Sequence, residues 1–283
     1  MSEEMISRRF QLSSFQIIIL GFAGVILLGA LLLMLPISAA ERCVTPFLDA
    51  LFTATSAVCV TGLVLHDTGS YWSAFGQTVI LALIQIGGLG VVTVAASFAL
   101  LSRRRISLMQ RTTMQDAISA PNVGGIVRLT KFILWGTFLI EMIGALAMLP
   151  VFCRDYGWHG IWMAVFHSVS AFCNAGFDIS GTAENLYPSL TGYAQNPMIN
   201  ITIMLLIIIG GIGFLTWEDI WENKLQFRRY RMQSKVILIF TLILIIFPAF
   251  FLSLLILLLF LSKRVFRQLS SSQSQQEQPV SIQ

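Results

Sequence analysis

Two segments of this sequence combine small side chains, hydroxyl side chains and a glycine near the end of each segment. Residues 50–63 read ALFTATSAVCVTGL and residues 164–177 read AVFHSVSAFCNAGF, with the same Ala, Phe, Ser, Ala, Cys and Gly at matching places. Neither segment carries the Arg or Lys that would bind an anion. A strand whose carbonyl oxygens face one axis can replace the hydration shell of a cation. We therefore predict coordination of a dehydrated monovalent cation by backbone oxygen; the alternative is a packing hairpin in a protein whose binding site lies elsewhere.

Each segment is predicted to begin as a short helix and to return as an extended strand. For the first, Thr45 is the expected N-cap, Pro46 suits the first turn, and Asp49 is favoured near a helix N-terminus. Residues 46–57 would form about 18 Å of helix, roughly half a bilayer. Non-helical backbone at membrane depth is tolerated only inside protein or along a wet cavity. Gly62 and Gly176 can adopt a positive φ at little cost and turn a carbonyl inward.

Several other polar residues are weaker candidates. Asp67 and Asp178 follow the two segments and either raise the local cation concentration at an outer mouth or cap a loop. Glu141 lies within an apolar stretch, where a carboxylate is a functional candidate, but a structural partner is an equal alternative. His167 is expected to pack rather than to ligate, and His66 and His159 stand alone.

The four cysteines give no metal or redox motif. The sequence has no C-x-x-C and no H-E-x-x-H. Cys59 and Cys173 occupy matching places where a small side chain suffices, and a disulfide between Cys43 and Cys153 is conceivable but not expected. A phosphate-binding loop or nucleophile elbow is not evident either, so we do not expect an enzyme.

The elements that position these residues are membrane-spanning helices. Apolar residues make up 56% of the chain and charged residues 11%, against about 25% charge in a soluble domain. Five stretches approach the roughly 20 residues that a span needs: Phe15–Leu35, Thr78–Leu101, Phe132–Val151, Ile199–Leu215 and Val236–Leu261. We predict an all-α, multi-pass protein of the cell membrane.

The basic residues favour a cytoplasmic N-terminus. With that orientation, the segments 102–131 and 217–235 and the first residues of the chain hold most of the Lys and Arg, as the positive-inside rule requires. Because these residues cluster at span ends, the net charge of +4 indicates topology and not nucleic-acid binding.

A second echo supports tandem repeats. LIQIGGLGVVT at 83–93 matches LIIIGGIGFLT at 206–216, so the unit is a span, a re-entrant loop and a second span, written twice. The GG-x-G pattern permits close helix packing or a bend.

These residues together resemble the Trk/Ktr/HKT superfamily of potassium transporters, specifically the bacterial membrane subunit. The resemblance rests on TATSAVCVTGL, HDTGSYW, QIGGLGVVT, HSVSAFCNAGFD and IIGGIGF, in order over residues 10 to about 250. It implies potassium-channel-like repeats around a central pore, with one glycine in each filter strand. Serine at the first filter glycine goes with sodium selectivity in this superfamily, so Gly62 favours potassium, and a sodium-selective member is the alternative. The implied filter residues are Cys59, Val60, Thr61, Gly62 and Leu63, with Cys173, Asn174, Ala175, Gly176 and Phe177.

The resemblance also implies partners. It suggests a homodimer in the lipid bilayer, gated by a cytosolic nucleotide-binding regulatory ring. The basic segments 102–131 and 217–235 would dock that ring, although anionic lipid explains their charge equally well. Potassium is the substrate at the filter, and no cofactor or other metal is expected in the chain itself.

The expected organisation covers two complete repeats and the start of a third. The divisions are a cytoplasmic N-terminus 1–14, a first repeat 15–101, a linker 102–131, a second repeat 132–216, a linker 217–235, a first helix of a third repeat 236–261 and a polar tail 262–283.

The tail has two readings. SSSQSQQEQPVSIQ at 270–283 is typical of a disordered tail. With suitable codons, a shifted frame instead gives LFQSVTARTAGFNT, similar to residues 165–180, which favours a frameshift near 252–265. We then expect a truncated chain that does not conduct alone, so a non-conducting remnant is the alternative to potassium uptake.

Overall fold

The computed structural model describes residues 14–90, 93, 126–224 and 226–253. The chain divides into two compact units, Met1–Glu218 and Asp219–Gln283, and each is described by itself. The described residues form helices and turns with one isolated bridge, between Ala39 and Trp72. The predicted all-α class is therefore confirmed.

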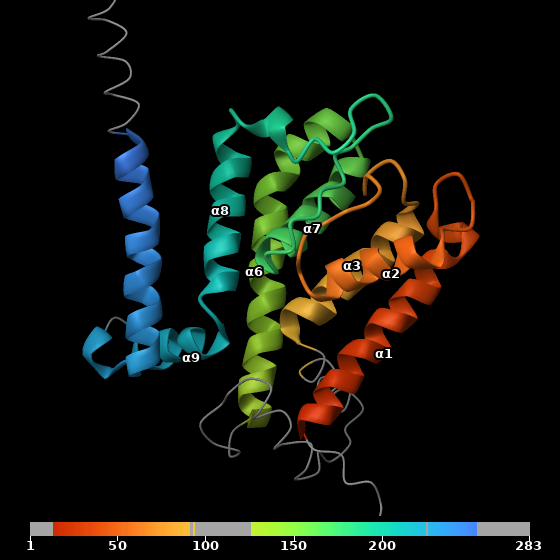
Figure 1. Cartoon of the computed structure of the whole chain (residues 1–283). Helices are drawn as coiled ribbons and strands as arrows, with labels where there is room; N and C mark the ends of the chain where they lie inside the picture. Colours follow the sequence, from red (N-terminus) through yellow and green to blue (C-terminus); the bar gives the residue numbers. More distant parts are fainter. Residues whose placement is uncertain (1–13, 91–92, 94–125, 225, 254–283) are drawn as a thin grey trace, which may run out of the picture. The chain divides into compact units, whose positions relative to one another are not determined.

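The first unit contains two groups of three helices. The first group is α1 (Ser14–Met34), α2 (Phe47–Val58) and α3 (Ala74–Leu89). The α2 helix packs against α1 and α3, and Figure 1 shows it tilted against both. Ser73 begins α3, because its hydroxyl accepts a hydrogen bond from the N–H of Gly76 at 3.2 Å.

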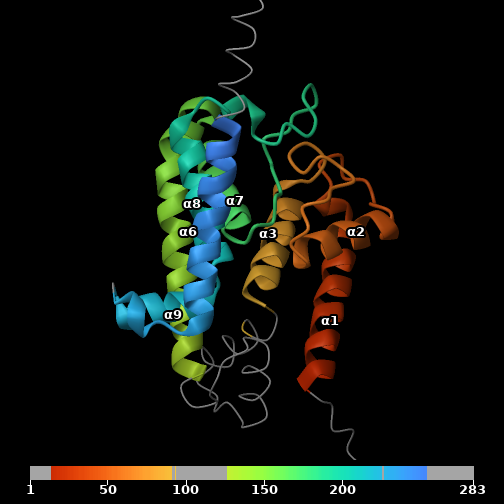
Figure 2. The same cartoon turned by 60° about the vertical axis from the view of Figure 1, so that its left-hand side comes forward.

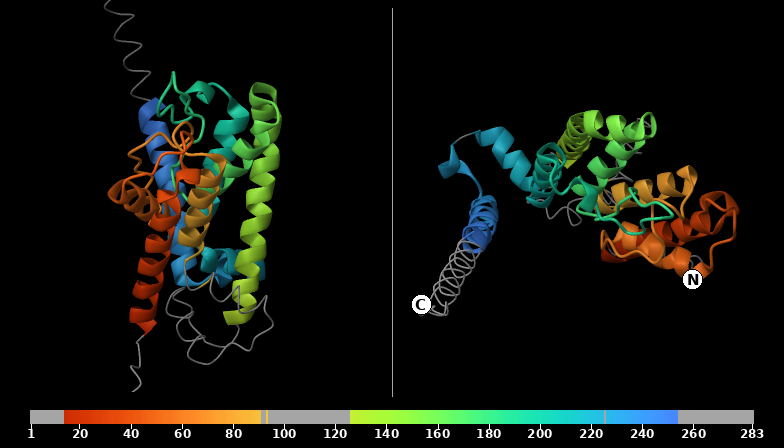
Figure 3. Two further views of the ribbon diagram at one scale, coloured as in Figure 1. Left: turned by 90° about the vertical axis from the view of Figure 1, so that its right-hand side faces the viewer. Right: turned by 90° about the horizontal axis from the view of Figure 1, so that it is seen from above.

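The second group has the same order of a long helix, a short helix and a return helix. It consists of α6 (Ile126–Tyr156), α7 (His159–Phe172) and α8 (Pro197–Gly211). The α6 helix contacts both α7 and α8, and α8 lies alongside α6 in Figures 1 and 2. Asn196 caps α8 by accepting from Met198 N–H at 3.0 Å. The two groups meet through α3 and α7 and lie side by side in Figure 3.

Short connecting segments complete the first unit. A turn of 3-10 helix, η1 (Pro36–Ser38), follows α1, and a second turn, η2 (Thr191–Tyr193), precedes α8. The core lies around α7, most of whose side chains are buried. By contrast, α1 exposes a leucine and isoleucine face, including Ile19, Leu27 and Leu31, as expected of a helix in lipid.

Among the described residues, three helices are long and apolar enough to cross a membrane: Gln16–Met34, Arg128–Tyr156 and Met232–Ser253. They confirm the first, third and fifth predicted spans, which supports a multi-pass membrane protein. The described part of the second predicted span is the 16-residue helix α3; its remainder, like the linker up to residue 125 and the tail, lies outside the described residues. The α6 helix begins inside the predicted linker 102–131.

The fourth predicted span is not one continuous helix. The chain bends by 93° between α8 and α9 (Phe214–Asn223). Gly213, the last glycine of the second GG-x-G, lies at the break with φ of 83°. Gly90, the matching glycine, ends α3 with φ of 81°. The predicted bend therefore occurs at the last glycine of the second motif, and α3 ends at the last glycine of the first, because a positive φ stops a helix.

The prediction for the start of the first short helix was wrong in detail. Pro46, and not Thr45, occupies the N-cap position of α2. The Thr45 hydroxyl lies 3.1 Å from the hydroxyl of Tyr71, so this long-range contact replaces local capping. Asp49 lies in the first turn as predicted.

The second unit includes the end of α9, the turn η3 (Phe227–Arg229) and the helix 232–253. Buried Asp219 accepts a hydrogen bond from the N–H of Arg231 at 3.0 Å and another from the Ser234 hydroxyl. These bonds hold the start of the apolar helix, because acidic side chains stabilise a helix N-terminus.

Candidate ion-binding strands

The two short helices end in the same way. In α2, Thr61 N–H donates to Ser56 O at 3.0 Å and Val60 N–H donates to Ala57 O at 3.3 Å. In α7, Ala175 N–H donates to Ser170 O at 2.8 Å, and Asn174 donates to Ala171 O in the same pattern. These pairs form Schellman motifs. The backbone therefore leaves α2 and α7 along matching paths.

The segments that follow, residues 59–63 and 173–177, belong to no β-sheet; they are called the first and second strand below. Their backbone conformations match. Val60 and Asn174 have φ of 57° and 58°, and Gly62 and Gly176 both have φ of 72°. The expectation of a positive φ at the two glycines is therefore confirmed. A positive φ is unusual for a β-branched residue, so Val60 is held there by the helix-ending motif.

The two strands touch each other at their glycines. A Cβ added to Gly62 would lie 2.7 Å from the carbonyl oxygen of Ala175, and one added to Gly176 would lie 3.6 Å from the Cα of Gly62. The fold thus brings together two segments that are more than a hundred residues apart in the sequence.

Most carbonyl oxygens of these strands have no protein donor. Among the described residues, no hydrogen bond reaches the oxygens of Thr61, Gly62, Ala175 or Gly176. Ala175 is 1% exposed, and buried backbone carbonyls are nearly always paired. An acceptor in this position needs a partner from outside the chain, such as a cation or water.

The last residues of the two predicted filter segments differ. The carbonyl of Phe177 accepts from the Ser170 hydroxyl at 2.8 Å, so this oxygen is already used. Leu63, its counterpart, is 61% exposed. Cys59 is exposed and Cys173 is buried, and all four cysteines are free thiols. Asn174 turns its amide toward α8, 3.5 Å from Ile207 O.

The first glycines of the GG-x-G motifs allow close packing behind the strands. A Cβ on Gly87 would overlap the carbonyl oxygen of Val58, and one on Gly210 would overlap that of Phe172. Val58 and Phe172 are the last residues of α2 and α7. Close packing therefore occurs at the start of both motifs, and the bend occurs at the end of the second.

Asp67 anchors the loop between the second strand and α8. Its carboxylate accepts from the N–H of Ser70 at 2.8 Å and from the N–H of Tyr187 at 2.9 Å. Gly181 packs directly on this carboxylate, where a Cβ would overlap it. Asp67 is 5% exposed, and its hydrogen bonds hold the loop in place. Its predicted effect on the local cation concentration stays a prediction.

Asp178 anchors the other side of the same loop. It accepts from Leu190 N–H at 3.0 Å and from Ser180 N–H at 2.7 Å, and its Oδ1 lies 2.8 Å from Nε2 of His167. Burial raises the pKa of Asp178, but the hydrogen bonds and charge of His167, with Ser180, outweigh it and hold the pKa at about 2. The carboxylate is therefore ionised.

Glu141 joins the two helical groups. Its Oε1 accepts from Nε2 of Gln85 in α3 at 2.9 Å, and its backbone oxygen accepts from the Ser168 hydroxyl at 2.6 Å. This is a structural partner of the kind predicted as an alternative, although the partner is an amide side chain. His66 is also paired, with Asp49 at 3.0 Å, and its ring stacks on that of Tyr71.

Long-range contacts of this kind were missed by sequence reasoning. The pairs Asp67 with Tyr187 and Gln85 with Glu141 follow no spacing rule. The signal that was present is the type of residue: an intramembrane carboxylate and an amide each need a partner.

These observations define a multi-pass membrane protein in which two short helices lead into strands that touch, and in the described part of the chain no donor reaches most of the carbonyl oxygens of these strands. Residues 8–278 match the TrkH family, described as a cation transport protein. This match covers most of the chain, and the chain therefore belongs to the TrkH family of cation transport proteins, which are not enzymes.

Curated relatives agree with this assignment. The chain is 40% identical over 239 residues to the potassium/sodium uptake protein NtpJ of Enterococcus hirae, covering 84% of this chain and 51% of that protein. It is 41% identical over 231 residues to the Ktr system potassium uptake protein B of Bacillus subtilis, covering 81% and 50%. The corresponding protein of Vibrio alginolyticus is 36% identical over 229 residues, covering 80% and 48%. The chain spans about half the length of the curated relatives it matches.

Proposed function

We propose that this chain supplies two filter strands of a pathway that carries potassium across the cell membrane. The observation that carries the proposal is the set of unpaired carbonyl oxygens at Thr61, Gly62, Ala175 and Gly176, on strands that touch. A dehydrated cation needs several such oxygens in place of its water shell. The relatives named as potassium uptake proteins support the same substrate.

Two strands give an ion about half the oxygens of a four-strand filter. The proposal therefore places further strands around the same axis, from a longer polypeptide or from a second copy. Gly62 favours potassium; the name of the Enterococcus relative keeps sodium as the alternative substrate.

We also propose that the N-terminus is cytoplasmic and that regulatory partners bind on the cytoplasmic side. A cytoplasmic N-terminus places the basic residues of 217–235 inside the cell, in line with the charge rule. A cytosolic nucleotide-binding regulatory ring and a second membrane subunit are the proposed partners. Exposed Arg228 and Arg229 offer positive charge for docking, for which anionic lipid would compete.

A chimeric transporter tests the proposal. Residues 10–250 of this chain would replace the matched half of the Bacillus subtilis relative, and the chimera would be expressed in cells that lack their own potassium uptake. We expect growth at limiting potassium and uptake of rubidium or potassium tracer. A chimera that reaches the membrane at wild-type levels but takes up no potassium contradicts the proposal, and uptake of sodium alone supports the alternative.

A further inference from the structure

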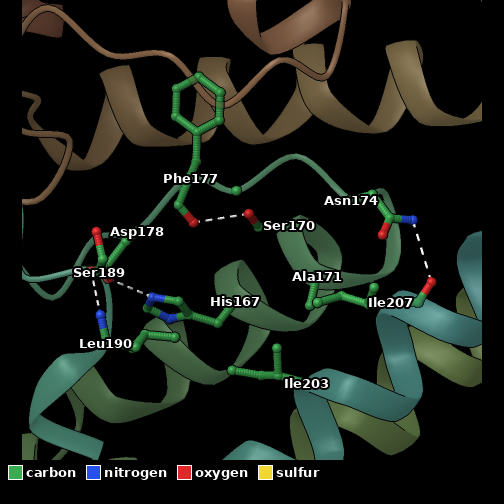
Figure 4. Close-up of a pocket in the computed structure, with 11 residues that line it drawn as sticks. His167, Ser170, Ala171, Asn174, Phe177, Asp178, Ser189, Leu190, Ile203 and Ile207 are labelled. Carbon is green, nitrogen blue, oxygen red and sulfur yellow. Dashed lines mark hydrogen bonds and ion pairs between the residues drawn. The ribbon is translucent and has the colours of Figure 1, made fainter. Parts of the chain in front are cut away.

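Two side chains of α7, His167 and Ser170, contact the second strand and the residue that follows it. His167 Nε2 lies 2.8 Å from Asp178 Oδ1, and the Ser170 hydroxyl donates to the Phe177 carbonyl at 2.8 Å. Figure 4 shows both contacts at the side of a cavity of about 260 Å³. The two anchored residues follow Gly176 directly, so they fix the outer end of the strand.

The partners of His167 define its hydrogen atoms. Nδ1 lies 2.7 Å from the backbone oxygen of Met163, and a carbonyl only accepts, so Nδ1 carries a hydrogen. Asp178 already accepts from Ser180 and Leu190, as an ionised carboxylate does. An ionised carboxylate also only accepts, so Nε2 carries a hydrogen as well. Both contacts are satisfied when each ring nitrogen carries a hydrogen, as in an imidazolium that pairs with Asp178.

The ring has little freedom to move. His167 is 2% exposed. It stacks on Phe152 of α6, with centroids 5.3 Å apart, and meets Phe166 edge to face at 6.0 Å. The charged group that contacts it is Asp178; Tyr193 lies behind the Phe152 ring and bonds to Asp155. Rigid packing of this kind turns a hydrogen bond into a fixed distance.

The first strand is held differently. Thr53 occupies the place in α2 that His167 occupies in α7, and its hydroxyl donates to Asp49 O within its own helix at 2.9 Å. Within the strand itself, the side-chain link to α2 is the 2.8 Å contact between the hydroxyls of Ser56 and Thr61, before Gly62. Beyond the strand, Asp49 of α2 pairs with His66 at 3.0 Å. The far ends of the two strands are therefore held by different side-chain pairs: His167 with Asp178 two residues after Gly176, and Asp49 with His66 four residues after Gly62.

We propose that His167 is a positioning residue for ion selection. Its imidazolium fixes the outer end of the second strand through Asp178, and so sets the distance of the Ala175 and Gly176 oxygens from those of the first strand. This inference rests on the proposed potassium pathway for its effect on transport, but not for the state of the ring.

The state of the ring is tested on the full chain in lipid nanodiscs. The chain has three histidines, so histidine labelled with ¹⁵N gives few signals, and His167→Gln assigns one of them. At pH 7.5 we expect hydrogen on both ring nitrogens of His167. A native ring with one bare nitrogen overturns the inference, whether or not the chain conducts.

The effect on selection is tested by uptake, with two variants that separate packing from donation. His167→Phe keeps the stack on Phe152 and removes both donors, whereas His167→Gln keeps a donor that can reach Asp178. We expect His167→Phe to weaken apparent potassium affinity on the order of tenfold and to increase inhibition by sodium, since a hydrogen bond to a charged group is lost. We expect His167→Gln to retain part of the potassium affinity and of the resistance to sodium that His167→Phe loses.

The control is His159→Gln, at the exposed start of α7, which should leave affinity unchanged. If His167→Phe transports potassium with unaltered affinity and sodium inhibition, His167 is not a positioning residue. If His167→Phe does not fold, His167→Gln is compared with the wild type instead. Unaltered ion selectivity in His167→Gln, together with a neutral His167 ring in the wild type, overturns the inference. Absence of uptake by the unmodified chimera instead contradicts the proposed function and leaves the ring measurement valid.

Discussion

At the scale of single residues, the carboxylates near the strands are acceptors for backbone N–H groups. Asp67 accepts from the N–H of Tyr187 and Asp178 from the N–H of Leu190, both in the loop before α8. Charged acceptors make shorter and stronger hydrogen bonds than neutral ones. The loop that follows the second strand is thus held at two points, one of them on the first helical group.

The low pKa of Asp178 has a consequence for stability in acid. Its folded pKa of about 2 lies below the ordinary value of 3.8, so it stabilises the fold fully above pH 3.8. That stability, about 2 kcal/mol, is lost as the pH falls through 2. We expect the unfolding free energies of wild type and Asp178→Asn to differ at pH 6 and to converge toward pH 2. A difference that does not change over this range would contradict the account. Ser253→Ala, on an exposed helix, is the control.

At the scale of elements, each return helix is seated by a glycine on the end of a short helix. Gly87 meets the carbonyl of Val58 and Gly210 meets that of Phe172. The obstacle is backbone in both cases, so it cannot move aside as a side-chain rotamer does. Close approach of this kind is the usual reason for small residues where membrane helices meet.

Alanine at these glycines tests the seating. Gly87→Ala gains about 1 kcal/mol of helix propensity, but overpacking against fixed backbone costs about 1–3 kcal/mol or more. We expect a net loss of stability, measured as a lower midpoint of thermal unfolding in detergent, and the same for Gly210→Ala. Gly24→Ala, in α1 with nothing within 4 Å of the added Cβ, should be neutral or stabilising. An unchanged midpoint for both seated variants would show that the helices are not held by this contact.

At the scale of the whole molecule, the sequence predicted what depends on local pattern. Apolar length predicted the first, third and fifth spans, and the repeated segments predicted two short helices with a positive φ at Gly62 and Gly176. The positive φ of Val60 was not predicted, because a β-branched residue disfavours it and only the helix-ending motif enforces it. Thr45 was misassigned because a distant partner, Tyr71, competes for its hydroxyl.

Contacts between the two helical groups could not be predicted from one sequence. The contact of Gly62 with Ala175 and the bond of Gln85 to Glu141 depend on which helices meet. That choice is made by packing over the whole first unit, and no spacing within a segment encodes it.

The central claim is that backbone oxygens beside Gly62 select the ion, and a side chain at this glycine tests it most directly. Gly62→Ser would place a Cβ 2.7 Å from the oxygen of Ala175 at a φ of 72°, a conformation that costs about 1–2 kcal/mol outside glycine. Gly157→Ser has a similar positive φ but open space around it, and it controls for backbone strain alone. The measurement is inhibition of potassium uptake by sodium in the chimera. We predict several-fold stronger inhibition in Gly62→Ser than in wild type or Gly157→Ser; equal inhibition in all three would remove Gly62 from the filter and contradict the account.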